Sequence, residues 1–135
     1  MWIWHQASGK LLDPSGLVIG FGYSGRGVGK NNPESQSLEN VGPIPEGYYK
    51  IGEPHDSVTH GPFVLALTPD PQNNMHGRKE FLIHGDSVIQ PGTASKGCIV
   101  LSRSVREDIA KSFDKVLAVV SGDFTPKRDP TEKSA

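Results

Sequence analysis

The hydrophobic positions of this chain fall into short runs that are separated by turn signals. Valine, isoleucine, leucine and aromatic residues dominate the runs, and clusters of Gly, Pro, Asn and Asp stand between them. Runs of about four to eight residues with this make-up are typical of β-strands. We expect strands at residues 2–5, 11–12, 17–23, 48–51, 63–67, 81–84, 98–101 and 116–120. The pattern therefore predicts a mostly β fold.

One segment has the period of a helix instead. Val105, Ile109 and Phe113 recur every four residues and would lie on one face of a helix. Ser104 and Glu107 have the spacing of a capping box, in which each side chain bonds the backbone amide of the other residue. The pattern predicts one short α-helix from about Val105 to Phe113.

Composition indicates one globular domain that is rich in turns. The 135 residues include 16 glycines and 11 prolines, which favours short strands over long helices. We expect residues 1–122 to form this domain. The polar residues 123–135 are expected to be a flexible C-terminal tail.

Charge and hydropathy exclude several partners. The 14 basic and 15 acidic residues leave no positive surplus to attract nucleic acid or an anionic membrane. No apolar run approaches the roughly 20 residues of a membrane span, and the N-terminus lacks the pattern of a secretory signal. We therefore expect no nucleic-acid partner, no membrane insertion, and synthesis in the cytoplasm without a signal peptide.

The candidate chemistry lies between residues 81 and 101. His84 closes one expected strand, and Cys98, the only cysteine, opens the next. Two strand ends that face each other across a loop can bring an imidazole within hydrogen-bond reach of a thiol. A cysteine nucleophile needs such a partner, because a free thiol has a pKa of about 8.5 and is mostly protonated at neutral pH. A buried, unreactive cysteine is the alternative.

The sequence supports a metal or phosphate site less well. The glycine-rich residues 24–30 lack the spacing of a phosphate-binding loop, and no His-Glu-x-x-His pattern is present. The histidines expected at the surface are His5, His55 and His60. A site of His84, Asp86 and a further histidine stays open, although no spacing requires it. We predict no bound metal and no cofactor.

The residues around the expected pair resemble a known signature. Ile83-His84-Gly85 followed by Ser95-Lys96-Gly97-Cys98-Ile99 is similar to the catalytic motif of the L,D-transpeptidases, which are bacterial cell-wall enzymes. Further segments resemble the branch of this family that type VI secretion delivers into rival bacteria. These segments are Tyr23-Ser24-Gly25, Asn31-Asn32-Pro33, Gly42-Pro-Ile-Pro-Glu-Gly-Tyr48, Gly77-Arg78 and Cys98-Ile-Val-Leu101. The resemblance covers roughly residues 1–120.

The resemblance implies both a site and a fold. Cys98 would be the nucleophile, and His84 would be the base that takes its proton. The carbonyl of Gly85 would orient the imidazole, and amides near Gly97 and Cys98 would form an oxyanion hole. The implied fold is a mostly β, L,D-transpeptidase-like sandwich with one short α-helix after the catalytic cysteine.

Several residues are candidates for substrate binding. A guanidinium clamps a carboxylate in a fork, which makes the arginines candidates for holding the substrate carboxylate. The candidates are Tyr23, Ser24, Arg78, Asp86, Ser95, Arg103 and Arg106. The short polar side chains among them could instead order the loop. The wider family usually has a histidine at the position of Lys96 and an arginine at that of Val100.

The implied reaction is acyl transfer on peptidoglycan stem peptides. Cys98 would attack the amide that links the L-centre of the diamino acid to the terminal D-alanine, which gives a thioester. Water would then trim the tetrapeptide to a tripeptide, or a free D-amino acid would be exchanged in. As a toxin of this branch, the protein would need the type VI secretion machinery, act in the target-cell periplasm and have a cognate immunity protein.

Other functions stay open at this level. The chain could be a housekeeping or phage-borne cell-wall enzyme. It could be a zinc- or thiol-dependent hydrolase that cuts another wall bond. It could also be a non-catalytic wall-binding module in which Cys98 is merely buried.

Overall fold

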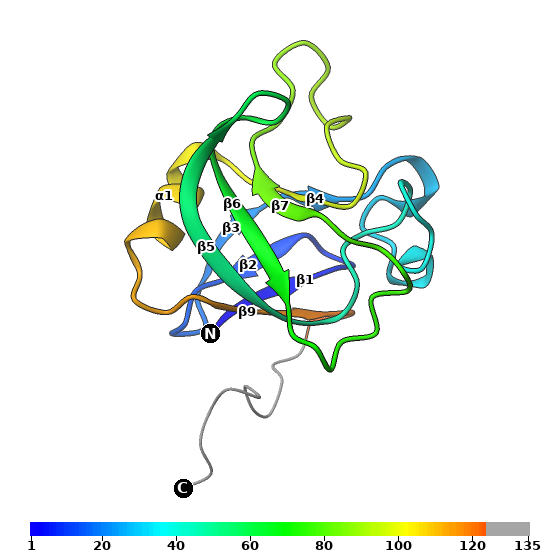
Figure 1. Cartoon of the computed structure of the whole chain (residues 1–135), viewed down its shortest axis with the longest axis horizontal. Coiled ribbons are helices and arrows are strands. Elements are labelled where there is room, and N and C mark those ends of the chain that lie inside the picture. The colour runs from blue at the N-terminus through cyan, green and yellow to red at the C-terminus, as the bar shows by residue number, and fades with distance from the viewer. Residues whose placement is uncertain (124–135) are drawn as a thin grey trace, which may run out of the picture.

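The computed structural model describes residues 1–123, which form a chain dominated by β-strands (Figure 1). The strands are β1 (Trp2–His5), β2 (Lys10–Leu12), β3 (Val18–Phe21), β4 (Tyr23–Ser24), β5 (Gly47–Ser57), β6 (Gly61–Pro69), β7 (Phe81–His84), β8 (Ile99–Val100) and β9 (Val116–Val120). In this part of the chain one α-helix, α1 (Arg103–Lys111), follows β8, and short 3-10 turns span Gly27–Gly29 and Pro33–Ser35. The prediction of a mostly β fold with one short helix is confirmed.

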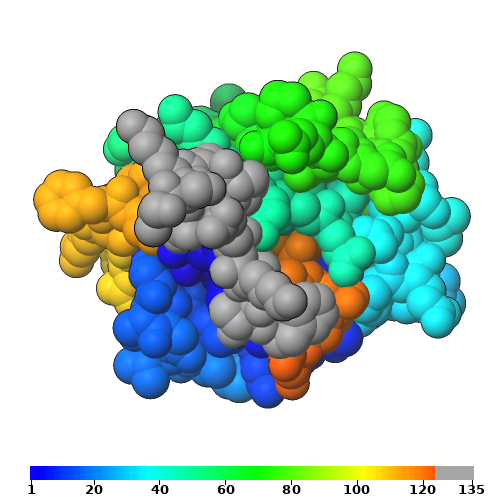
Figure 2. Space-filling view, turned by 90° about the horizontal axis from the view of Figure 1, so that it is seen from below, coloured from blue at the N-terminus to red at the C-terminus, as the bar shows by residue number. Residues whose placement is uncertain are grey.

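The nine strands belong to one sheet, in the order β3-β2-β1-β9-β5-β6-β7-β8-β4. Strands β3 and β4 form opposite edges of this sheet, yet only Gly22 separates them in the chain. The sheet therefore curls until its two edges meet, and its two halves enclose one main core (Figure 1). Strand β9, the fourth in this order, pairs with β1 on one side and β5 on the other, and it is visible in orange in the view from below (Figure 2).

The chain passes from one sheet edge to the other at Gly22, where a side chain has no room. The Gly22 amide donates to the carbonyl of Gly9 over 2.8 Å. A Cβ at Gly22 would lie 1.9 Å from the carbonyl oxygen of Val100. Only glycine permits so close an approach of two backbones. The single strand predicted at residues 17–23 is therefore wrong, because the chain changes sheet edge within it.

The core inside the curled sheet holds the two strands nearest the expected site. Ile83 of β7 and Ile99 of β8 are fully buried in it. Successive side chains of a strand point to opposite faces. His84, which follows Ile83, and Cys98, which precedes Ile99, accordingly lie on the other side, where they line a groove.

Helix α1 begins earlier than predicted. Its N-cap is Ser102, whose extended backbone suits a cap and whose hydroxyl accepts a hydrogen bond from the amide of Val105 over 3.4 Å. The capping box predicted at Ser104 is therefore wrong. Val105 and Ile109 pack into the core as expected. Phe113 lies beyond the end of the helix and is fully exposed, so its predicted place on the apolar face is also wrong.

Strands β5 and β6 are longer than the strands predicted at residues 48–51 and 63–67. They pair antiparallel as one long hairpin. The turn of this hairpin and the loop after β7 project at the same end of the molecule, at the top of Figure 1. Segments that are distant in sequence thus meet at this end.

Two further expectations concern the ends of the chain and the membrane. Among the described residues, no helix combines the length and the apolar content that a membrane crossing requires. Of the predicted tail, residues 124–135 lie outside the described residues.

Replacement of Gly22 by alanine should destabilise the fold by about 3 kcal/mol or more, because the new methyl group would overlap the backbone of β8. Chemical denaturation followed by circular dichroism measures the free energy of unfolding. The matched control is Gly52→Ala in β5, where the nearest atom would be 3.5 Å from the new Cβ. Equal stability of the two variants would contradict the closure of the sheet at Gly22.

Candidate active site

Strands β7 and β8, which carry the expected pair, run parallel, with His84 opposite Val100. The sequence pattern predicted that the two strand ends would lie close together but left the relative direction of the strands open. Parallel neighbours need a crossover connection, and residues 85–98 return the chain to the start of β8. This return leaves Cys98 just before β8 and beside Leu82, whose amide donates to Sγ over 3.4 Å.

His84, at the end of β7, and Cys98, directly before β8, both line the groove and lie close together there. A ring nitrogen of His84 and Sγ of Cys98 lie within 4.8 Å of each other. Nδ1 of His84 is 2.7 Å from the carbonyl oxygen of Gly85. Because a carbonyl only accepts, Nδ1 carries the hydrogen, and Nε2 is the nitrogen left for the thiol.

Both members of the pair are neutral at pH 7. Burial lowers the pKa of His84 below its ordinary 6.5, and the positive charge of Arg106 acts in the same direction, while the bond to Gly85 opposes them. Burial raises the pKa of the Cys98 thiol above its ordinary value, while the hydrogen bond from the Leu82 amide favours the thiolate and lowers the pKa. The arrangement suits a base that takes the thiol proton during attack, rather than a preformed ion pair.

The loop of residues 85–98 is held at its first half by a carboxylate. Asp86 accepts hydrogen bonds from the hydroxyl of Tyr23 (2.6 Å) and the amide of Gly92 (3.1 Å). The Tyr23 oxygen in turn accepts from the amide of Ala94 (2.9 Å). Burial, together with the bond to Asp86, raises the pKa of Tyr23 to about 12, so the phenol remains a donor. Tyr23 and Asp86 are therefore paired with each other.

Two buried serines hold the second half of the loop. Ser95 Oγ accepts from the amides of Gly25 (2.9 Å) and Gly97 (3.0 Å) and donates to the carbonyl of Cys98 (2.5 Å). Ser24 Oγ donates to the carbonyl of Gly97 over 2.7 Å. Gly97 has a φ of +144° and no room for a Cβ, so glycine is required there. Its amide already donates to Ser95, so Gly97 is not available as the oxyanion-hole donor that the sequence suggested.

Two of the candidate arginines are buried and bond carbonyl groups. Arg78 donates to the carbonyls of Gly42 (3.0 Å), Pro43 (2.7 Å) and Lys96 (3.2 Å), and so ties the loop to the segment before β5. A further bond runs to Gln36 (2.6 Å). Most of its donor capacity is thereby used within the protein.

Arg106 and Arg103 extend from the first turns of α1. Arg106 is buried. It donates from Nε to the carbonyl oxygen of Leu101 (3.1 Å) and from Nη1 to the carbonyl oxygen of Phe63 (2.8 Å). Its Nη2 makes no hydrogen bond within the described residues and lies close to Gly85. Arg103 is exposed, stacks on the Phe63 ring with its guanidinium carbon 4.4 Å from the centroid, and pairs with Glu107 (3.5 Å).

A histidine that the sequence placed only at the surface joins the site. His60 is exposed, in the turn between β5 and β6, and its ring centroid is 4.9 Å from that of His84. One nitrogen of His60, one of His84 and Sγ of Cys98 all lie within 4.8 Å of one another, a set that could hold a metal ion. The sequence around His60 signals only a turn, so nothing local predicts this contact. His5 was also expected at the surface, but it is buried.

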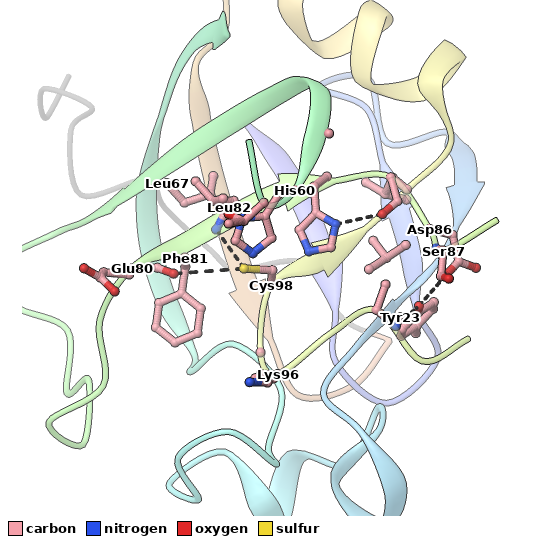
Figure 3. Close-up of a pocket in the computed structure, with 18 of the residues that line it drawn as sticks. Tyr23, His60, Leu67, Glu80, Phe81, Leu82, Asp86, Ser87, Lys96 and Cys98 are labelled. Carbon is pink, nitrogen blue, oxygen red and sulfur yellow. Dashed lines mark hydrogen bonds between the residues drawn. The ribbon is translucent and has the colours of Figure 1, made fainter. Parts of the chain in front are cut away.

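The site opens into a broad groove with a volume of about 1620 Å³. Figure 3 shows Cys98 beside His60 and Leu82, with Tyr23 and Asp86 farther along and Lys96 on the other side of the sulfur. The charged residues on the groove wall include Glu80, Lys79 and Lys96. A groove of this size suits an extended polar chain better than a small metabolite.

A family model described as the Tlde1 domain matches residues 20–121 of the chain. The chain belongs to this family. The Tlde1 family is one of type VI secretion L,D-transpeptidase effectors, so membership implies an effector that modifies peptidoglycan and that has the secretion machinery and an immunity protein as partners. No curated protein and no solved structure matches the chain. The matched part of this Tlde1 domain includes His84 and Cys98, whereas β1 and β2 precede it.

Alkylation of Cys98 by iodoacetamide should accelerate as the pH rises, with a midpoint at a higher pH than that of a free thiol. Burial raises the pKa of the Cys98 thiol, so it is less ionised at pH 7 than a free thiol is. Mass spectrometry of the intact protein measures the rate, because Cys98 is the only cysteine. A free thiol such as N-acetylcysteine is the reference. A rate that stays constant between pH 6 and 8 would indicate a preformed thiolate and contradict the neutral pair.

Proposed function

We propose that this Tlde1 domain is a cysteine-dependent acyl transferase that acts on peptidoglycan stem peptides. The observation that carries the proposal is that His84, whose Nδ1 is bonded to Gly85, has a ring nitrogen within 4.8 Å of the Cys98 sulfur in one groove. The substrate bond would be the amide between the L-centre of the diamino acid and the terminal D-alanine. The family match supports this substrate class.

In the first half of the proposed reaction, Sγ of Cys98 bonds to the carbonyl carbon while Nε2 of His84 takes the thiol proton. The carbonyl oxygen gains the electron pair, and the backbone amide of Cys98 would donate a hydrogen bond to it. His84 then gives the proton to the D-alanine nitrogen. The carbon–nitrogen bond breaks, D-alanine leaves, and a thioester remains on Cys98.

In the second half, water or the amine of a free D-amino acid attacks the thioester. His84 accepts a proton from the attacking group and returns it to Sγ as the carbon–sulfur bond breaks. Attack by water gives the tripeptide, and attack by an amine gives an exchanged tetrapeptide. Both routes need only His84 and Cys98, so the supply of amine in the groove sets their balance.

The terminal carboxylate of the substrate needs a cation close to the nucleophile. Arg78 is largely committed to carbonyl groups, as described above. The Lys96 side chain is exposed on the groove wall only two residues before Cys98. We therefore assign Lys96 to this carboxylate, with Nη2 of Arg106 as a second donor at the end of β7.

We place the reaction in the periplasm of a target cell, after synthesis in the producer and delivery by type VI secretion. The stem peptides are exposed in that compartment, and the family supports this route. Removal of donor stems would weaken the wall of the target. An immunity protein would protect the producer from its own enzyme.

Replacement of Cys98 by alanine should slow the loss or exchange of terminal D-alanine from tetrapeptide muropeptides by about a thousandfold or more, because no nucleophile remains. His84→Ala should lose about a hundredfold or more, because no base takes the proton. Liquid chromatography with mass spectrometry identifies the products. His55→Ala, an exposed histidine of β5 outside the groove, is the matched control and should keep parental activity.

The products of the same muropeptide assay also distinguish the proposed function from the alternative functions. A Cys98→Ala variant as active as the parent would falsify the mechanism. Cleavage of a different bond would point to a wall hydrolase of other specificity. Intact muropeptides that stay bound to the protein would point to a wall-binding module.

Lys96→Ala should raise KM for the tetrapeptide about tenfold, because the terminal carboxylate loses its cation. Steady-state kinetics with a free and an amidated C-terminus measure this effect. Parent and variant should have equal KM for the amidated peptide, which has no carboxylate to bind. Lys50→Ala, an exposed lysine of β5 outside the groove, is the control. An equal loss on both peptides would contradict the assignment.

A further inference from the structure

We propose that His60, His84 and Cys98 form a Zn²⁺ site whose occupation switches the acyl-transfer site off. We infer the metal binding from the geometry of these three side chains alone. The inhibition rests on the proposed function, because that function needs two of the three ligands. His60 comes from the β5–β6 turn, so the site joins two parts of the chain that are separate in sequence.

The distances permit metal binding after a small movement. The three donor atoms lie within 4.8 Å of one another. Some point is therefore within about 2.8 Å of all three, whereas zinc bonds to nitrogen and sulfur measure about 2.0–2.3 Å. Each donor must move by roughly half an ångström or slightly more. His60 is exposed in a turn and can supply much of this movement.

Both imidazoles are already oriented as metal ligands usually are. Nδ1 of His84 donates to the carbonyl of Gly85 over 2.7 Å, and Nδ1 of His60 is 2.9 Å from the hydroxyl oxygen of Thr59. A histidine that binds a metal through one nitrogen almost always bonds a second protein group through the other. Nε2 of each ring is thereby left for the ion. Figure 3 shows His60 beside the sulfur of Cys98.

The donor set selects the class of metal. Two imidazole nitrogens and one thiolate suit Zn²⁺, whereas Ca²⁺ and Mg²⁺ prefer oxygen ligands. The nearby carboxylate of Asp86 is bonded to Tyr23 and Gly92 and is not part of the cluster. Three protein ligands leave a fourth position for water. The site is therefore of the two-histidine, one-cysteine type.

Binding would exclude acyl transfer. Coordination of Sγ releases the thiol proton to solvent and ties up the sulfur lone pair that would attack the substrate. Coordination of His84 Nε2 removes the nitrogen that would take a proton. The enzyme is then inactive until a competing ligand removes the metal. This inference departs from the expectation of no metal, which was drawn from sequence spacing alone.

The test uses Co²⁺ as a spectroscopic probe for the Zn²⁺ site in the full chain, after treatment with a chelator. One equivalent of Co²⁺ should give thiolate-to-cobalt charge-transfer absorption and the visible bands of a tetrahedral ion. Zn²⁺ should displace it. Cys98→Ser should lose the charge-transfer band, and His60→Ala should bind Co²⁺ at least tenfold more weakly. His55→Ala is the matched control and should bind like the parent within twofold.

Three results would overturn the proposal. They are the absence of a charge-transfer band in the parent, an unchanged affinity in a His60→Ala variant that is folded by circular dichroism, and binding that His55→Ala weakens equally. Because these are binding measurements, they stand apart from the activity test. A parent that needs Cys98 for activity but binds no Co²⁺ would refute this site and leave the proposed function intact.

The inhibition is measured separately on muropeptides. One equivalent of Zn²⁺ should stop D-alanine release by the parent, and a chelator should restore it. Relative to its own metal-free rate, His60→Ala should need at least tenfold more Zn²⁺ for the same inhibition. Zinc that is bound but leaves the rate unchanged, or that raises the rate, would overturn the inhibitory role.

Discussion

The parallel pairing of β7 with β8 is the interaction on which the candidate site depends. It sets the end of one short strand, with His84, beside the residue that precedes the other, Cys98. The buried side chains of Ile83 and Ile99 hold the register. A slip by one residue would carry His84 into the core and an isoleucine into the groove, which makes the register costly to change. The hydrophobic core therefore enforces the geometry of the polar site.

The crossover between these strands contains no helix, so hydrogen bonds must order it. Ser24 and Ser95 bond its backbone, and Asp86 bonds Tyr23 across it. Buried polar groups that lack partners are costly, and here the buried hydroxyls of Tyr23, Ser24 and Ser95 all have partners in the network. Several residues that seemed suited to the substrate thus have their hydrogen-bonding capacity used by the loop. Exposed cations on the groove wall are the groups that remain available.

Burial determines the electrostatics of the pair. A desolvated imidazole loses its proton more readily, and a desolvated thiol keeps its proton, so both groups are neutral before substrate arrives. A neutral imidazole can accept a proton, and it can equally bind a transition metal. With His60 at the rim, the same donors serve proton transfer when the groove is free and metal binding when zinc is present. The two uses compete because they need the same lone pairs.

The sequence by itself determined the strand content and the approximate place of the helix, and it singled out His84 and Cys98, which the structure brings into one groove. These features are encoded locally. Alternating apolar positions, turn residues and a short motif can each be recognised from neighbouring residues in the sequence. Only the tertiary structure decided that β7 and β8 are parallel, that the chain changes sheet edge at Gly22, and that His60 reaches the site. These features depend on which distant segments pair when the sheet closes around its core. The periodicity of a single segment does not encode which segments pair, because the pairing follows from the packing of the whole sheet.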